Sequence, residues 1–428
     1  MSAKILLAIC WGAASLESGA VMAQCSPQET GLLLASDPSA YDYFGYSVGL
    51  DGDTAVVGAY FDHDGGGGVG NGVVDVFVRS GGEWMHQGQL TTAQVGPLDN
   101  FGRAVAVSGD TAIVGALDAD PQQQSSAGAA FVFVRSEGAW TQQAELTALN
   151  AQENDWLGWS VAIDSDTVAL GAVNVATPGG YSAGAVYVFV RNAQLWTQQA
   201  EIIPADTAEG GHLGWSVAID GDTLIAGAPS WDGPDFDPGA AYVFVRSGET
   251  WFEQGLLTAS DAPLESALGS AVAIDGDTAV VGAPGWSGTL LTGAAYVFVR
   301  SGGVWTQQAK LTAFDGASQD KFGYAVAVRG STVLVGAPGD DAQGDLNAGS
   351  VYLFTRSGNV WFSQGKFTAA APETDGSFGR SIAVNPSTAL VGSGLDTPSG
   401  VDAGAVHVVQ LNCAVPVIVS ADPPNDNP

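Results

Sequence analysis

Segments rich in aspartate and glycine hold most of the side chains in this sequence that could do chemistry. Carboxylate oxygens on a loop that glycine makes flexible are ligands that Ca²⁺ prefers. The same composition is typical of a solvated turn, in which Asp bonds to nearby backbone. We therefore expect acidic binding loops, with calcium as an alternative and any metal unassigned, at Asp62, Asp64, Asp232, Asp235, Asp237, Asp340, Asp341 and Asp345.

Catalytic groups do not gather in one place. The four histidines, His63, His86, His212 and His407, are scattered along the chain, and no single cluster of polar residues stands apart. General acid–base chemistry needs only two well-placed acids, and 45 acidic residues leave any such pair unidentified. The sequence favours a non-catalytic protein, with a carbohydrate-active hydrolase or lyase that uses a carboxylate pair as the alternative.

The net charge restricts the partners. Lys and Arg number 13 against 45 Asp and Glu, which gives a net charge of -32 and a pI ≈ 4.1. Binding to nucleic acid or to an anionic membrane surface requires positive charge, so the sequence argues against both. Protein or glycan ligands, basic ones included, and divalent cations stay open. Acidity can also serve solubility alone.

The N-terminus has the pattern of an export signal. Lys4 precedes an apolar stretch over 5–14, and small residues at 21–23 suit a cleavage position. We expect a signal peptide over 1–23 and a protein that is secreted or held at the cell surface. Cys10 leaves with this segment, and Cys25 and Cys413 remain, an even number that suits an oxidising compartment. No later apolar stretch reaches the length of a membrane span.

A repeat of 54 to 57 residues covers the rest of the chain. Each copy contains a short strand, a tight turn, a second strand that ends at Gly-Ala or a relative, and two further strands. Examples of the expected strands are 216–220, 295–300 and 305–313. Each copy begins at a Phe/Leu-Gly step, at Phe44-Gly45, Phe101-Gly102, Leu157-Gly158, Leu213-Gly214, Leu268-Gly269, Phe322-Gly323 and Phe378-Gly379.

Four short antiparallel strands per copy, seven times over, are typical of β-propeller blades. The predicted fold is all-β, a seven-bladed β-propeller over 24–413. One Trp and one Arg recur in almost every copy, in series that start at Trp84 and Arg79. Their period predicts a structural role between blades.

The last blade lacks its fourth strand, because no Trp follows the strand at 404–409. The segment 32–35, before the first Phe-Gly step, supplies the missing strand. Aligning the repeats places Cys25 and Cys413 at adjacent positions of the turn that this blade lacks. We therefore predict a Cys25–Cys413 disulfide, and on the chain-entropy model a loop this long gives a stabilisation on the order of 5 kcal/mol.

The repeat resembles the FG-GAP repeats of integrin α-subunit propellers and, more closely, their bacterial relatives, as in the pattern over 311–327. The resemblance covers about residues 28–412 and implies a propeller. Integrin-type blades often hold calcium in an Asp-rich loop between the first and second strands. Here that connection is only Asp-Gly-Asp or a relative, a hairpin signal with too few oxygens for six- to eight-fold coordination.

The long, variable loops join second to third strands and fourth to first strands, and so lie together on one face. Variable loops on a rigid scaffold are where function usually lies. We expect a secreted binding or adhesion module, a monomer, that uses this acidic long-loop face. A structural repeat domain of a surface assembly is a further alternative. Residues 414–428 are expected to form an unstructured tail.

Overall fold

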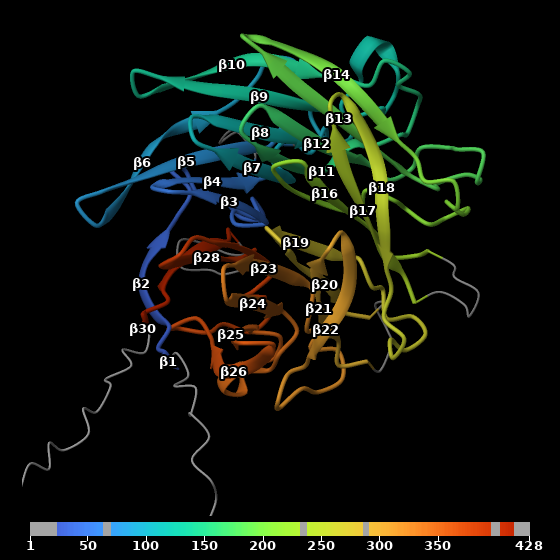
Figure 1. The fold of residues 1–428 in the computed structure, drawn as a ribbon. Coiled ribbons are helices and arrows are strands. Elements are labelled where there is room, and N and C mark those ends of the chain that lie inside the picture. The colour runs from blue at the N-terminus through green and yellow to red at the C-terminus, as the bar shows by residue number, and fades with distance from the viewer. Residues whose placement is uncertain (1–23, 63–69, 232–237, 286–290, 395–402, 415–428) are drawn as a thin grey trace, which may run out of the picture.

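The computed structural model describes residues 24–62, 70–231, 238–285, 291–394 and 403–414. Seven four-stranded antiparallel sheets are arranged around a central axis, with a two-stranded ribbon at the chain ends (Figure 1). This is the seven-bladed propeller that the repeat predicts. The expected signal peptide over 1–23 and the tail after Ala414 lie outside the described residues.

The first strand of each blade lies nearest the axis. These strands contact their neighbours in a closed circle, since the seventh also contacts the first. They are β3 (Ser47–Asp51), β7 (Ala104–Ser108), β11 (Leu157–Asp164), β15 (Ser216–Asp220), β19 (Ala271–Asp275), β23 (Ala325–Arg329) and β27 (Ser381–Val384).

The second strands are almost wholly buried, because neighbouring blades cover both of their faces. Near-continuous runs of small and apolar residues suit this double burial. They are β4 (Thr54–Ala59), β8 (Thr111–Ala116), β12 (Thr167–Ala172), β16 (Thr223–Ala228), β20 (Thr278–Ala283), β24 (Thr332–Ala337) and β28 (Thr388–Ser393).

The third strands carry the large buried rings, among them Tyr187, Tyr242, Tyr296 and Tyr352. The hydrophobic core is divided into clusters, and each cluster contains residues from two adjacent blades. The third strands are β5 (Val73–Ser80), β9 (Ala129–Ser136), β13 (Ala185–Asn192), β17 (Ala240–Ser247), β21 (Ala294–Ser301), β25 (Ser350–Ser357) and β29 (Ala405–Gln410).

The fourth strands form the outer rim. They are β6 (Glu83–Leu90), β10 (Ala139–Leu146), β14 (Leu195–Ile202), β18 (Thr250–Leu257), β22 (Val304–Leu311), β26 (Val360–Phe367) and, in the last blade, the N-terminal β2 (Gln28–Leu33). Strand β2 pairs antiparallel with β29, which confirms closure of the last blade by the N-terminal strand.

The two ends of the propeller meet in the ribbon formed by β1 (Gln24–Cys25) and β30 (Cys413–Ala414). Its register places Cys25 opposite Cys413 and Gln24 opposite Ala414. The predicted disulfide joins two residues that this pairing brings face to face, and it stays a prediction.

Two short 3₁₀ helices, η1 (Pro121–Gln123) and η2 (Ala342–Gly344), lie in connections between second and third strands. No helix within the described residues has the length and hydropathy to span a membrane.

Blades are held together by a repeated polar staple. In the fourth blade, Arg246 donates to Asp222 of its own blade at 2.7 Å and to Thr167 of the preceding blade at 2.9 Å. Its guanidinium lies 5.2 Å from the ring centroid of Trp251, whose Nε1 donates to Gln199 of the preceding blade. The Trp and Arg series therefore links blades, as its period predicts.

Candidate functional site

A four-residue turn precedes the innermost strand of every blade. Its two central residues are the Phe/Leu-Gly step, and the backbone N–H of the fourth residue donates to the carbonyl of the first at 3.0–3.2 Å in all seven blades. The first residue is left-handed, with φ of 54–60°, although none of the seven is glycine. We call this segment the axial turn. Because the centre of the turn is the same in every blade, the two variable residues at its ends occupy equivalent positions.

The glycine of each axial turn is required by close contact between blades. Gly102 faces Gly58 of the preceding blade, where a Cβ on Gly58 would lie 1.9 Å from the Gly102 carbonyl oxygen. The equivalent distance is 1.9–2.2 Å at all seven blade junctions, too short for any side chain. The glycine of the Gly-Ala step therefore packs against the glycine of the Phe/Leu-Gly step of the next blade. We call this contact the interlock. This interlock holds the axial turns rigidly around the axis.

The fourth residue of each axial turn lies beside the axis at the start of an innermost strand. Because the turn follows a fourth-to-first connection, these residues lie at the end of the axis on the long-loop face. All seven are partly buried. We call them the axial ring, which consists of Tyr46, Arg103, Trp159, Trp215, Ser270, Tyr324 and Arg380.

Six members of the axial ring form a continuous arc. The Arg103 guanidinium carbon lies 5.8 Å from the ring centroid of Tyr46 and 3.7 Å from that of Trp159. Trp159 in turn lies 4.7 Å from Trp215, centroid to centroid. On the other side, Arg380 lies 4.3 Å from Tyr46 and 5.4 Å from Tyr324. The small side chain of Ser270 separates the two ends of the arc.

Charge and burial shift the proton equilibria of the arc. Burial by itself would raise the pKa of the Tyr46 phenol, but the guanidiniums of Arg103 and Arg380 outweigh it and hold that pKa below its ordinary value. The Tyr324 and Tyr46 phenols likewise outweigh burial and raise the pKa of Arg380. Burial, together with the nearby Tyr46, raises the pKa of Tyr60 to about 12.

The first residues of the axial turns form an outer layer that is also irregular in type. Tyr43 and Trp156 belong to it, and Trp156 stacks on Trp159 at 5.7 Å. His212 meets Trp215 edge-on at 6.0 Å, and burial lowers the pKa of its imidazole. The full layer is Tyr43, Asn100, Trp156, His212, Ala267, Lys321 and Ser377.

Two of the described acidic loop residues, Asp340 and Asp341, have hydrogen-bond partners in their own blade. Asp340 is buried and accepts hydrogen bonds from Ser350 and from Lys366 Nζ, the latter at 2.8 Å. Asp341 accepts from the Asn347 backbone N–H at 3.0 Å, and Asp345 is partly exposed. Asp62 is buried near the start of the connection that follows β4. Asp64, Asp232, Asp235 and Asp237 lie outside the described residues.

Within the described residues, no group of three or more His, Cys, Asp or Glu side chains has the geometry of a metal site. The calcium alternative stays a prediction for the loops as a whole.

The Asp-Gly-Asp turns at the opposite face have a structural use for both acids. The first Asp caps the turn of the next blade, as where Asp164 accepts from the Gly221 N–H at 2.7 Å. The second Asp is the partner of the staple arginine, as in Asp222 with Arg246. This arrangement recurs in several blades. These acids are therefore used in hydrogen bonding between and within blades.

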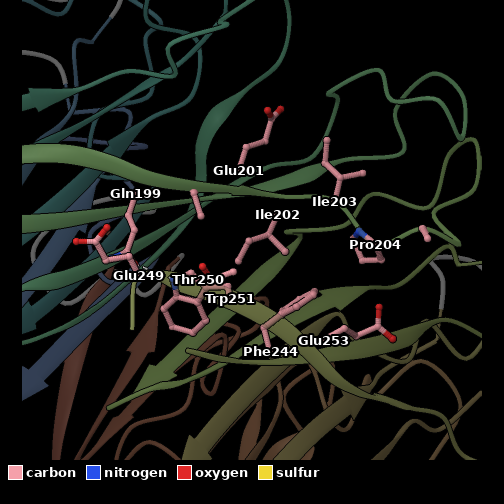
Figure 2. A pocket seen from close by; sticks show the side chains of 12 residues that line it. Gln199, Glu201, Ile202, Ile203, Pro204, Phe244, Glu249, Thr250, Trp251 and Glu253 are labelled. Carbon is pink, nitrogen blue, oxygen red and sulfur yellow. Dashed lines mark hydrogen bonds between the residues drawn. The ribbon is translucent and has the colours of Figure 1, made fainter. Parts of the chain in front are cut away.

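A groove of about 400 Å³ lies between the outer strands β14 and β18. Figure 2 shows Gln199, Ile202 and Pro204 along one side and Trp251, Phe244 and Glu253 along the other. A similar groove lies between the last and first blades, at Thr30, Leu32 and Trp84. Because the repeat itself generates such grooves, neither marks a singular site.

The axial ring was not predicted from the sequence. Its members are far apart in the chain, and only the circle of blades brings them together. A signal was present, because the position after the Phe/Leu-Gly step changes its residue type from copy to copy while its neighbours repeat. Such a position presents a different side chain in each blade, although the backbone around it repeats.

The repeats also match a known family. A family description, the FG-GAP repeat, fits seven consecutive segments, residues 28–77, 84–133, 140–189, 196–244, 251–298, 305–354 and 361–409. The chain belongs to the FG-GAP repeat family. Its propeller resembles that of integrin α-subunits. Each FG-GAP segment begins on an outer strand and ends in the third strand of the next blade, which is the order that lets β2 close the circle.

Among solved structures, the chain is similar to the crystal structure of Saccharomyces cerevisiae Sqt1, with a TM-score of 0.49 and 12% sequence identity. That match covers 91% of this chain and 99% of the Sqt1 chain. No curated protein matches this sequence.

Proposed function

We propose that this FG-GAP propeller is a secreted, non-catalytic binding module whose ligand contacts the axial ring. The observation that carries the proposal is the ring itself. Seven structurally equivalent positions hold two arginines, four aromatic residues and one serine, while the surrounding turn is the same in every blade. Partly exposed Trp, Tyr and Arg side chains on a rigid frame are the residue types that dominate binding energy at recognition surfaces.

Binding is favoured over catalysis by the use of the nearby acids. None of the seven ring positions carries a carboxylate. The acids just before the axial turns bond to backbone instead, as where Asp99 accepts from the Gly96 N–H at 2.7 Å and Asp155 from the Gln152 N–H at 2.7 Å. The same cap recurs at Asp42 and Asp320. A group that repeats with the blade and caps a turn is structural.

The long-loop acidic face fits this proposal as a rim around the ring. Export through the segment 1–23, and use of the module in adhesion, belong to the same proposal and are supported by the basic and apolar pattern of that segment. A net charge of -32 would keep polyanions away from the rim. The ligand is therefore expected to reach the ring as a narrow end group rather than as an extended acidic chain.

Binding can be tested with an array of glycans and peptides probed by the secreted protein. One variant carries Trp159→Ser and Trp215→Ser, which gives two more blades the ring residue that Ser270 already provides. The matched control carries Leu195→Ser and Phe252→Ser on the outer strands, where both side chains are exposed. Thermal midpoints verify that both variants are folded.

The proposal predicts array ligands that the ring variant loses and the outer-strand control keeps. Binding that survives in the ring variant, or an array without any ring-dependent ligand, would overturn it. Release of reducing ends or of unsaturated products from a bound glycan would instead favour the hydrolase or lyase alternative.

A further inference from the structure

Two arginines in the axial ring lack the aspartate partner that most of the described arginines have. Five of the six staple arginines pair with an aspartate at 2.6–2.7 Å. Arg103 instead donates to the Trp159 carbonyl at 3.1 Å, and Arg380 lies against two phenols. Within the described residues, neither guanidinium has a carboxylate at ion-pair distance. Positive charge is thus concentrated on the axis of a strongly acidic protein.

This arrangement is costly in the absence of an anion. Both guanidiniums are partly buried, and both lie against the same ring, that of Tyr46, at 5.8 and 4.3 Å. Two like charges against one phenol ring repel each other, and burial removes water that would screen them. The aromatic faces offset part of the cost through cation–π attraction. An anion bound by the two guanidiniums would lower the cost further.

The flat rings beside the arginines indicate what is attached to the anion. Trp159 and Trp215 continue the arc from Arg103, and both rings are only partly buried. Planar guanidiniums match the two oxygens of a carboxylate, and an adjacent aromatic face suits a compact ring with an apolar side. The acidic rim disfavours a polyanion, so the charge should be borne by one residue at an end of the ligand.

We propose that the axial ring binds the carboxylate of an acidic sugar through Arg103 and Arg380, with the sugar ring beside the exposed parts of Trp159 and Trp215. This inference rests on the proposed function and adds the class of ligand. The acidic sugar can be a free monosaccharide or the terminal residue of a glycan, and these two sources share the same chemistry.

Calorimetric titration of the secreted protein with D-glucuronate, and with D-glucose as the neutral match, tests the class of ligand. The variants are Arg103→Gln and Arg380→Gln. Arg329→Gln is the matched control, since it removes the same charge from the opposite face, where its side chain is 55% exposed. We expect glucuronate to bind, glucose to bind at least tenfold more weakly, and each ring variant to lose about tenfold or more in affinity for glucuronate. The control should retain wild-type affinity.

A second measurement uses unmodified protein and so does not depend on the folding of variants. Acetate at matched ionic strength should compete with glucuronate, whereas chloride should not. A neutral oligosaccharide capped by glucuronate, compared with the free sugar and with an oligosaccharide whose uronate is internal, distinguishes the sources. Tighter binding of the capped chain indicates a glycan end, and equal binding indicates the free sugar.

Equal affinity for glucuronate and glucose, wild-type affinity in both ring variants, or no competition by acetate would overturn this inference. The proposed function would survive such a result if the array still shows a ring-dependent ligand without a carboxylate. Loss of all ring-dependent binding on the array would overturn both.

Discussion

Single glycines at the blade junctions decide whether this propeller can close. Gly227 in β16 faces the Gly269 carbonyl of the next blade, and a Cβ there would lie 1.9 Å from that oxygen and 2.5 Å from Ser216 Oγ. Its φ is not in the left-handed region. The need for glycine at this position is therefore a matter of space alone, and it explains a sequence anchor that recurs in most copies.

Gly227→Ala should lower the free energy of unfolding by at least about 1–3 kcal/mol, because backbone on the facing blade must move. Gly255→Ala in the outer strand of the same blade is the control, since nothing lies within 4 Å of its added Cβ. It should change stability by no more than about 0.5 kcal/mol. Denaturant unfolding of both variants checks this, and equal effects would refute the interlock.

Tyr46 should make ligand binding depend on pH. The groups that face its phenol are Arg103, Arg380, Tyr60 and Tyr324. The pKa of Tyr46 is held below its ordinary value, so its phenolate forms first as the pH rises and competes with an added anion for the two guanidiniums. Glucuronate affinity should therefore fall as the pH rises through this pKa.

The variant Tyr46→Phe should abolish that fall in affinity over the same pH range. Tyr60→Phe should keep it, since the pKa of Tyr60 is about 12. Calorimetric titrations across the alkaline range measure both. A fall of equal size in Tyr46→Phe would show that another group is responsible.

Among the elements, one of the six staple arginines lacks the aspartate with which the other five pair. Arg356 in the sixth blade keeps its contacts with Trp361 and Thr278, but the position of the paired aspartate is Ser331. The backbone there matches the other blades, since the Arg356 N–H donates to the Ser331 carbonyl at 2.8 Å, as Arg246 does to Asp222.

Ser331→Asp should therefore create the missing ion pair and raise the free energy of unfolding by about 0.2–1 kcal/mol, because the pair is exposed. The gain should shrink at high salt. Ser331→Asn serves as the uncharged control in denaturant unfolding at low and high salt. A gain of equal size from Asn, or one that salt leaves unchanged, would mean that the ion pair is not its source.

Strands were predictable from the sequence because each has a periodic signature. The expected first strand 216–220 is β15, residue for residue, whereas the expected fourth strand 305–313 is β22 at Val304–Leu311, since the chain turns after Leu311. The closing strand β2 begins at Gln28, four residues before the expected segment. Strand ends depend on contacts with the next blade, which no single repeat contains.

The axial ring could not be predicted in the same way. Tyr46 and Arg380 lie at opposite ends of the chain, and their contact depends on closure of the circle. Within one repeat, each ring residue is merely the first residue beyond a Phe/Leu-Gly step. Its contacts with the other ring residues form only when the seven copies are arranged around one axis.

At the scale of the whole molecule, closure joins the two ends of the chain. Strand β2 completes the last blade, and the β1–β30 ribbon places Cys25 opposite Cys413. A link between these residues would close a loop that contains the whole propeller. In the unfolded state, that loop would restrict the chain strongly.

We predict that peptide mapping of the secreted protein without reductant finds Cys25 linked to Cys413. Reduction, Cys25→Ser and Cys413→Ser should each lower the midpoint of unfolding by a similar amount, corresponding at most to about 5 kcal/mol. Two freely alkylated thiols in the folded, secreted protein would rule out the link.

We propose that the ligand binds at the axis on the long-loop face. A structure of the protein in complex with its tightest array ligand would show the binding position. We expect the ligand to contact Tyr46, Arg103 or Arg380 and the neighbouring tryptophans of the axial ring. A ligand seated in the outer groove between β14 and β18, or on the face of the Asp-Gly-Asp turns, would contradict it.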